Sequence, residues 1–475
     1  MTHNRTHFIA AAALLAAAPL VAQSPSATAA PVRATVTAES TTVAKAKTPL
    51  TYEDSVRIAK SRKQQLLYRT IELQHVRPAD QRGLNVFESP KDDSIPFEGM
   101  KLAWGGAFAQ QFQGLGHENS AAANVVGGVN ANQLIVMGHG FNNADANLNL
   151  GVQLAQGIRL NVTTYASARH HQETWVKDGY ILMDASPIDN DYLNIAMQFL
   201  TIKAGHFEVN YGDEHFRRSD NGNTIFNPFV GNLLMDAFTT EIGGEVDFRL
   251  NGFLAMGGMT AGEIHGQVTA ADKRAPSFLG KLGYDKQFDP ARRVRLTGSI
   301  YRTAHSANNT LYSGDRGGSR YYDVLENSAS TETSQAWSGS VRPGLSDNLT
   351  AIVINPFVKF GGIEFFGNIE QATGKAAAEL GNRTWKQNSG EVLYRFAPRE
   401  QLYVGARYNT TNGGLPGIAK EVSVDRTQLA VGWFITPALL TKIEWVTQQY
   451  NDFPANDIRN GGKFRGFMVE GAVAF

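Results

Sequence analysis

Short runs in which apolar and polar residues alternate dominate the chain from Lys101 onward. In residues 363–370 the odd-numbered positions are Ile, Phe, Gly and Ile, whereas the even-numbered positions include two glutamates. Residues 241–248 and 391–396 repeat this pattern. Because successive side chains of a β-strand point to opposite faces of a sheet, the runs predict strands with one apolar face and one charged face.

Connections of two different lengths separate these runs. Tight turns that contain Gly or Pro occur at residues 155–157, 249–252, 360–362, 397–399 and 436–438. Long polar loops lie largely in alternation with them, at residues 115–140, 211–238, 303–345, 372–387, 411–424 and 450–462. This alternation predicts a closed antiparallel meander with two unlike ends.

The runs number about sixteen, an even number within the range of bacterial outer-membrane barrels. Their starts are predicted near Lys101, Phe141, Ile158, Trp175, Tyr192, Phe238, Phe253, Pro276, Arg292, Ser346, Ile363, Ser389, Gln401, Asp425, Leu439 and Lys463. The alternation slips at Phe199 and Leu200, so that Leu200 and Ile202 would turn inward, and we expect a β-bulge there. The fold class is therefore all-β: a transmembrane antiparallel β-barrel of about 16 strands, preceded by a short helical periplasmic segment.

The last strand is expected to close the barrel. One of its faces carries Phe467, Val469, Gly471, Val473 and Phe475. In hydrocarbon an unpaired backbone amide costs several kcal/mol, so a sheet crosses a membrane only when its last strand pairs with its first. We expect the chain to stop at Phe475 because the barrel closes there. The five residues resemble the terminal signal by which outer-membrane barrels are recognised, so lipid of that membrane and the barrel assembly machinery are the expected partners.

The residues before the barrel divide into three parts. Residues 1–22 have the basic start, short apolar run and small-residue end of a secretory signal peptide, with residues 27–29 as an alternative cleavage site. Residues 23–50 have low complexity and predict a disordered linker. Residues 51–100 predict a periplasmic segment with a helix that begins near Thr51, and the barrel follows at 101–475. The expected location is the bacterial outer membrane, after export and removal of the signal peptide.

The composition excludes several classes of function. The chain has no cysteine, so neither disulfides nor thiolate chemistry is available. Its 44 basic and 44 acidic residues lack the basic excess of a nucleic-acid binder. No cofactor is expected, and no metal site is predicted, because adjacent residues such as His170 and His171 point to opposite faces of a strand.

Two stretches of the barrel region resemble a known family. Residues 200–216, LTIKAGHFEVNYGDEHF, and residues 432–452, GWFITPALLTKIEWVTQQYND, resemble the phosphate-selective porin O/P-like family of Gram-negative bacteria. The resemblance covers residues 101–475. It implies a porin, which is a water-filled channel for passive diffusion of small hydrophilic solutes or ions, with anions such as phosphate among them. From this resemblance we expect the protein to form a homotrimer and to have no enzymatic activity.

Charged residues on the inward faces and in one loop are the candidate functional residues. The predicted pore-lining residues are Arg159, Arg295, Glu364, Glu391, Arg395, Arg407, Lys442 and Glu444. The loop after the fifth predicted strand carries a dense cluster of charge, namely Asp213, Glu214, Arg217, Arg218 and Asp220. Because wall side chains alone do not fill a barrel of this size, we expect this loop to fold inward and form a charged constriction. The alternative is a solvated external loop.

Two other functions remain open at this point. A barrel hydrolase would need a nucleophile and a base on its rim, and the sequence does not show such an arrangement. A structural or adhesive barrel would have a blocked lumen, with the basic N-terminal helix as the candidate plug. The channel hypothesis is the leading one.

Overall fold

The computed structural model describes residues 71–91, 95–168, 174–262, 274–312, 321–331 and 337–475. The chain divides into two compact units, Met1–Arg69 and Thr70–Phe475, and the described residues belong to the second. The predicted signal peptide, the linker and the helix that begins near Thr51 lie outside the described residues, as do His170 and His171.

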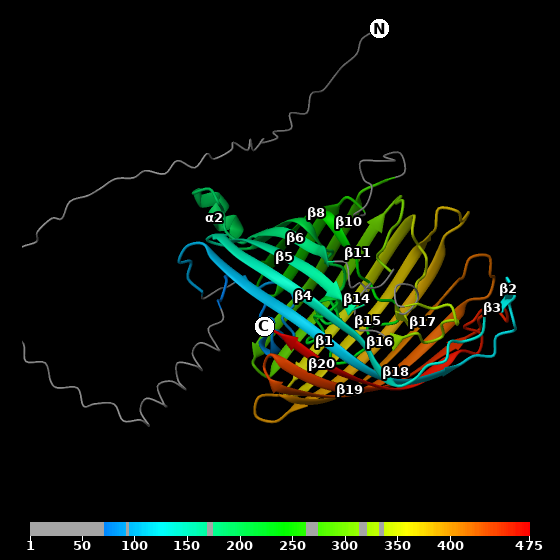
Figure 1. Cartoon of the computed structure of the whole chain (residues 1–475). Helices are drawn as coiled ribbons and strands as arrows, with labels where there is room; N and C mark the ends of the chain where they lie inside the picture. Colours follow the sequence, from blue (N-terminus) through cyan, green and yellow to red (C-terminus); the bar gives the residue numbers. More distant parts are fainter. Residues whose placement is uncertain (1–70, 92–94, 169–173, 263–273, 313–320, 332–336) are drawn as a thin grey trace, which may run out of the picture. The chain divides into compact units, whose positions relative to one another are not determined.

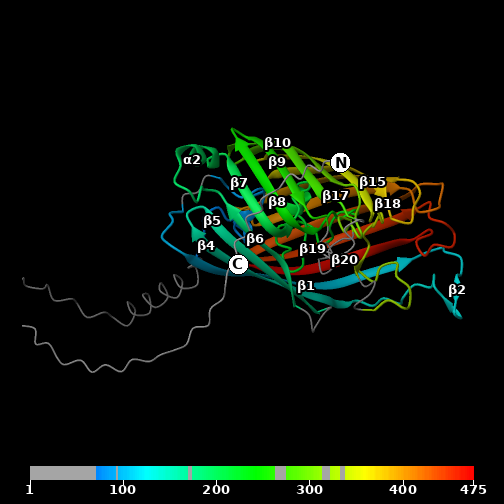
Figure 2. The same cartoon turned by 90° about the horizontal axis from the view of Figure 1, so that it is seen from above.

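Sixteen antiparallel strands form a closed barrel (Figures 1 and 2). They are β1 Lys101–Glu118, β4 Gly140–Ala155, β5 Ile158–Ser167, β6 Thr174–Met183, β7 Leu200–Glu208, β8 Thr240–Leu250, β9 Phe253–Thr260, β10 Ser277–Asp289, β11 Arg292–Thr303, β14 Asn348–Phe360, β15 Ile363–Lys375, β16 Arg383–Phe396, β17 Leu402–Gly413, β18 Val422–Thr436, β19 Leu439–Asn451 and β20 Lys463–Ala474. Small two-stranded ladders join β2 Val125–Val126 to β3 Val129–Asn130 and β12 Tyr321–Tyr322 to β13 Trp337–Ser338. The predicted fold class and strand number are confirmed.

The barrel closes where β20 pairs with β1, as predicted. Beyond the strand, the amides of Gly106 and Phe475 each donate to the other residue's carbonyl at 3.0 Å, which extends the pairing to the last residue. Phe467 and Phe475 lie exposed on the outer face and the three residues between them on that face are partly exposed, whereas Met468 and Glu470 are buried on the inner face. The predicted parity is correct. The role of the outer residues in assembly stays a prediction.

The two ends of the barrel differ, as the spacing of turns predicts. One end carries the short connections, for example the turn after β8, where Asn251 and Gly252 have φ of 52° and 91°. Positive φ at both central residues is the geometry of a type I′ hairpin, which Asn-Gly favours. The long loops and the β2–β3 ladder lie at the opposite end (Figure 1). We call these the short-turn end and the long-loop end; in bacterial outer-membrane barrels the short turns face the periplasm.

One predicted strand start is wrong. The residues around Tyr192 form a helix, α2 Asp191–Met197, which begins after Asn190 because the Asn190 side chain accepts hydrogen bonds from the next turn's amides. β7 therefore begins only at Leu200, and its ladders with β6 and β8 are continuous. No bulge is needed at Phe199, and Leu200 and Ile202 face outward. In the described part of the chain, no helix is both long enough and apolar enough to span a membrane.

The outer face of the barrel is a band of exposed apolar side chains. Members in the middle of the strands include Leu282, Ile300, Ile352, Ile369, Val392, Leu429 and Ile443. Exposed aromatic residues lie toward the short-turn ends of their strands, namely Trp104, Phe253, Tyr284, Phe360, Tyr394 and Trp433, and toward the long-loop ends, namely Phe141, Phe278 and Tyr408. An apolar band between two aromatic girdles is the surface that a lipid bilayer requires.

Replacing Leu282 with arginine is expected to destabilise the barrel by ~2–4 kcal/mol, because a charge near the bilayer midplane is poorly solvated. Leu282 lies at the centre of β10 and is 68% exposed. The measurement is folding into lipid vesicles over a urea series, followed by the heat-modifiable migration of the folded barrel. Leu282→Met is the apolar control. An arginine variant as stable as the control would contradict the assignment of this face to lipid.

Candidate functional site in the barrel lumen

The loop between β7 and β8, residues 209–239, folds into the barrel, and we call it the inner loop. Its backbone binds polar side chains of the wall: the amide of Leu234 donates to Asn409 (2.6 Å), and the amide of Met235 donates to Gln387 (2.7 Å). Such bonds satisfy backbone groups that a loop inside a barrel would otherwise leave unpaired. The sequence-based expectation of an inward fold for this loop agrees with the structure.

A second long loop, between β11 and β14, also packs inside through its described residues, 304–312, 321–331 and 337–347. Two tyrosines of its described part reach carboxylates of the wall: Tyr312 donates to Glu370 (2.6 Å) and Tyr321 donates to Glu444 (2.7 Å). Sequence reasoning treats this region only as a long polar loop, so its buried tyrosines are missed. We call it the second loop.

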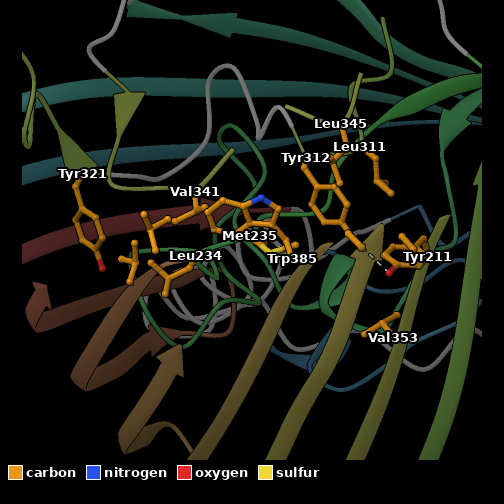
Figure 3. Close-up of a cluster of buried hydrophobic side chains, with 14 of the residues drawn as sticks. Tyr211, Leu234, Met235, Leu311, Tyr312, Tyr321, Val341, Leu345, Val353 and Trp385 are labelled. Atoms are coloured by element: carbon orange, nitrogen blue, oxygen red, sulfur yellow. Dashed lines mark hydrogen bonds between the residues drawn. The ribbon is translucent and has the colours of Figure 1, made fainter. Parts of the chain in front are cut away.

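An apolar cluster joins both loops to the wall (Figure 3). The inner loop contributes Tyr211, Leu234 and Met235, the second loop contributes Leu311, Tyr312, Tyr321, Val341 and Leu345, and the wall contributes Val353 and Trp385. Burial of these side chains stabilises the inward position of both loops, at roughly 1.5–3 kcal/mol for each large side chain removed from water.

The N-terminal segment, described over residues 71–91 and 95–98, lies at the short-turn end. The amide of Gln74 donates to Gln153 of β4 (3.1 Å), the amide of Gln81 donates to a carbonyl of the β18–β19 turn (2.9 Å), and Lys91 donates to a carbonyl of the loop after β6 (2.8 Å). β1 begins at Lys101, the residue at which the barrel region is predicted to start. The structure nevertheless packs the described residues before it against the barrel, within the same compact unit.

A charged cluster connects the N-terminal segment to the inner loop. Glu88 pairs with Arg295 (2.8 Å) and Lys281 (3.2 Å), and the same two bases pair with Asp213 (both 2.7 Å). Burial alone would raise the pKa of Asp213, but Lys281 and Arg295 hold it at about 2. The pKa of Glu88 is also held well below its usual range against the effect of burial, mainly by Arg295. The cluster therefore keeps both acids ionised.

The eight predicted pore-lining residues all face the interior, but protein covers them. Arg159, Arg295, Glu364, Glu391, Arg395, Arg407, Lys442 and Glu444 are all buried. They are paired within the protein: for example, Arg395 lies 3.0 Å from Glu364, and Arg407 lies 2.8 Å from Glu391. Arg159, Arg295 and Lys442 pair with other acids, and Glu444 accepts hydrogen bonds from Val230 and Tyr321. Because their partners lie within the protein, the pore-lining role of the eight residues stays a prediction.

The two arginines predicted for the constriction are buried in ion pairs. Arg218 donates two hydrogen bonds of 2.7 Å to Asp236, which lies in the same loop. Arg217 pairs with Glu391 of the wall and lies over the ring of Phe366 at 4.9 Å. This geometry makes both arginines anchors of the inner loop.

The three predicted acids of the constriction occupy different environments. Asp213 belongs to the cluster with Lys281 and Arg295. Burial raises the pKa of Glu214 to about 7, although Arg407 nearby opposes the shift. Asp220 is half-buried and pairs with Lys177 of β6. The structure thus brings all five residues into the lumen, and only Asp220 among them is more than marginally exposed.

The lumen is closed on one side and partly open on the other. On β14 to β20 the inward polar side chains are fully buried under the loops, including Asn355, Gln387, Asn409, Thr411, Gln428, Glu444, Gln448 and Glu470. On β4 to β7 several inward polar side chains are only half-buried, namely Asn149, Asn161, Thr163, Asp178, Tyr180 and Lys203. We call this stretch of wall the open side. These side chains keep part of their surface exposed, unlike the inward polar side chains of β14 to β20.

Sequence reasoning does not single out Lys203 as an inward residue. The strand start predicted near Tyr192 obscures the alternation along β7, which begins only at Leu200. The observed start at Leu200 places Lys203 inside, where it pairs with Glu245 of β8 (3.2 Å). The helix signal that would correct this is Asn190 followed by Asp191, an N-cap with an acidic first turn.

The closed sixteen-stranded barrel, its apolar band with aromatic girdles and its two unlike ends define a transmembrane β-barrel of the outer-membrane type. This agrees with the predicted location in the outer membrane. The chain is similar to an anion-selective porin from Comamonas acidovorans, with 11% identity and a TM-score of 0.47 over 79% of this chain and 100% of that chain. It is similar to the outer membrane channel DcaP of Acinetobacter baumannii, with 8% identity and a TM-score of 0.45 over 79% of this chain and 98% of that chain. It is also similar to outer-membrane expressed OmpT of Vibrio cholerae, with 9% identity and a TM-score of 0.46 over 80% of this chain and 99% of that chain.

No protein-family model matches the chain, and no curated protein matches it either. The resemblance to the phosphate-selective porin O/P-like family is therefore not confirmed. At identities of 8–11% and TM-scores below 0.5, the similar structures carry no argument about solute or activity.

Proposed function

We propose that this protein is an outer-membrane porin, a non-enzymatic channel for passive diffusion of small hydrophilic solutes. The observation that carries the proposal is the asymmetry of the lumen. The inner and second loops bury the wall of β14 to β20, whereas the inward polar residues of β4 to β7 remain half-buried. A narrow hydrated path between the inner loop and the open side follows from this arrangement.

Several features of the open side suit such a path. Its side chains are polar or charged, including Asn149, Asn161 and Thr163. Such groups form hydrogen bonds with water, so hydration of this face is favourable. Facing it, the inner loop presents Asp220 and Asn223, which are also half-buried. The inner loop also touches this wall: the amide of Gly222 donates to Asn147 of β4 (3.0 Å), and Asp220 pairs with Lys177 of β6. The width of the path therefore depends on these contacts and on the anchors at the far side.

Anions such as phosphate and a homotrimeric assembly belong to this proposal through the family resemblance alone. The described lumen offers little to support a preference for phosphate, because its buried bases are largely matched by carboxylates, as in the pairs of Arg295 with Asp213 and Lys442 with Glu470. A phosphate path would need basic groups that are not already neutralised.

A blocked barrel with a structural role is the second candidate, and one observation favours it. The N-terminal segment covers the short-turn end, and beneath it Arg159, Asp184 and Thr201 are fully buried. A channel of this design conducts only when that segment shifts. The hydrolase alternative has no comparable observation in its favour.

Liposome swelling with neutral sugars of graded size tests the channel directly. The purified full-length protein, folded into vesicles, is expected to admit small sugars and to exclude larger ones, and to give discrete single-channel steps in planar bilayers. Heat-modifiable migration confirms that the barrel is folded in the same sample. Folded protein that neither swells vesicles nor conducts would support the blocked barrel instead.

A further inference from the structure

Four carboxylates lie together on three adjacent strands at the open side, and we call them the acidic strip. They are Asp178 of β6, Glu208 of β7, and Glu245 and Asp247 of β8. Glu245 and Asp247 are 4% and 6% exposed, and the other two are half-buried. Lys203 is close enough to act electrostatically on all four. The strip therefore shares one central base.

Some carboxylate oxygens of the acidic strip accept no hydrogen bond from the described residues. One carboxylate oxygen of each member, Asp178 Oδ1, Glu208 Oε1, Glu245 Oε2 and Asp247 Oδ1, is buried and has no hydrogen-bond partner among the described residues. A buried polar group without a partner costs roughly 1–3 kcal/mol, and more when it is charged. Asp247 has no ion pair within the described residues. Each of these oxygens therefore lacks a donor that a bound cation could supply once it displaces the side chains covering them.

Lys203 shows what kind of group this environment holds. Its ammonium lies 3.2 Å from Glu245, 4.2 Å from the centre of the Phe207 ring and 4.9 Å from the centre of the Tyr180 ring. Carboxylates combined with aromatic faces stabilise ammonium and guanidinium groups. The site is therefore already built around one tethered organic cation.

Two of the bases around the strip pair with acids outside it. The lysines and arginines that face the strip are Lys177, Lys203, Arg218 and Arg249, and the imidazole of His206 lies near Asp178. Arg218 is engaged by Asp236, and Lys177 is engaged by Asp220. Lys203 and Arg249 are left to offset the four carboxylates of the strip. A positively charged solute would therefore be attracted here, and an anion would be repelled.

We propose that the acidic strip binds small organic cations that carry an ammonium or guanidinium group, as they pass along the open side. This substrate class rests on the proposed channel function. A guanidinium can donate to two carboxylates at once, which suits oxygens spread over three strands. A metal ion fits less well, because the described residues contain no group of three His, Asp or Glu side chains suited to hold one.

Binding of agmatine, which carries both a guanidinium and an ammonium group, tests the site. Isothermal titration of the detergent-folded full-length protein is expected to show binding of agmatine, and none of glutarate or glycerol. Glu245→Gln and Asp247→Asn should each weaken agmatine binding several-fold. Glu421→Gln, which changes an exposed acid outside the strip, should leave it unchanged. Equal binding by all four proteins, or no binding by the wild type, would overturn the proposal.

The reversal potential is a second measurement, and it would not change if Glu245 and Asp247 had a purely structural role. Across a tenfold KCl gradient the wild-type channel should favour K⁺, and the two strip variants should shift the potential toward Cl⁻, whereas Glu421→Gln should not. Sugar-induced swelling separates the two levels of inference. If vesicles swell but show neither cation preference nor agmatine binding, the proposed cation site is wrong and the channel function stands. If agmatine binds but vesicles do not swell, the binding site is supported and the channel function is wrong.

Discussion

Deleting residues 71–95 is expected to leave the barrel folded and to raise its single-channel conductance several-fold. The deletion removes no barrel strand, because β1 begins at Lys101. It does remove the segment whose Gln74, Gln81 and Lys91 bind three different parts of the short-turn end. Heat-modifiable migration reports the fold, and planar-bilayer recording reports the conductance.

Two further variants make this result specific. A deletion of 20 residues within the predicted linker, residues 26–45, should leave the conductance unchanged. The double substitution Glu88→Gln and Lys91→Ala keeps the chain length but weakens the contacts with Arg295 and Asp184, and it should increase the fraction of time spent in a conducting state. Conductance equal to the wild type in the 71–95 deletion would show that the segment does not obstruct the path.

Replacing Arg218 with alanine is expected to destabilise the inner loop by about 3–5 kcal/mol, because it leaves Asp236 buried without its ion-pair partner. Arg218 has a fully buried side chain and donates two hydrogen bonds to Asp236. The released loop should give noisier and larger current steps, and trypsin should cut residues 209–239 faster. Both effects arise from lost anchoring and not from a changed charge in the path.

The double substitution Arg218→Met and Asp236→Leu is the matched control. Replacing both members of a buried ion pair with apolar residues of similar size is often neutral, so this variant should regain much of the stability and the quiet current of the wild type. A filter role for Arg218 predicts a different outcome, in which both variants shift the reversal potential alike and trypsin sensitivity stays unchanged.

The barrel itself could be predicted because its physical requirements repeat along the chain. Hydrocarbon outside and polar groups inside impose an alternation on every strand, as in residues 363–370, and tight turns such as Asn251-Gly252 mark the short-turn end. Pairing of the first and last strands follows from the cost of an open edge. These rules are local or topological, so one sequence suffices to apply them.

The filling of the lumen could not be predicted in the same way. Tyr312 and Tyr321 lie in a loop that has no periodic pattern, and their partners Glu370 and Glu444 come from distant strands. Glu88 similarly meets Arg295 only because the folded barrel brings the N-terminal segment to β11. Contacts of this kind depend on the three-dimensional path of the chain, which alternation does not encode.

One wrong strand start leaves an inward base out of the predicted site. α2 replaces the first part of the strand predicted near Tyr192, and β7, which begins at Leu200, carries Lys203 on its inward face, where it pairs with Glu245. The structure places Arg217 and Arg218 in the inner loop. Their ion pairs with Glu391 and Asp236, however, show an anchoring geometry that charge density in the sequence does not distinguish from a filter.

A matched pair of cysteine variants tests the hydrated path at the open side most directly. The chain has no cysteine, so Thr163→Cys and Thr411→Cys each introduce one reactive thiol of nearly the size of the original side chain. Thr163 is half-buried on β5 at the open side, and Thr411 is 0% exposed on β17 beneath the inner loop. A charged, membrane-impermeant thiosulfonate should label Thr163→Cys rapidly and reduce its conductance while leaving Thr411→Cys unlabelled and fully conducting. Rapid labelling and block at Thr411→Cys, with Thr163→Cys unaffected, would place the path on the opposite side of the barrel and contradict the account.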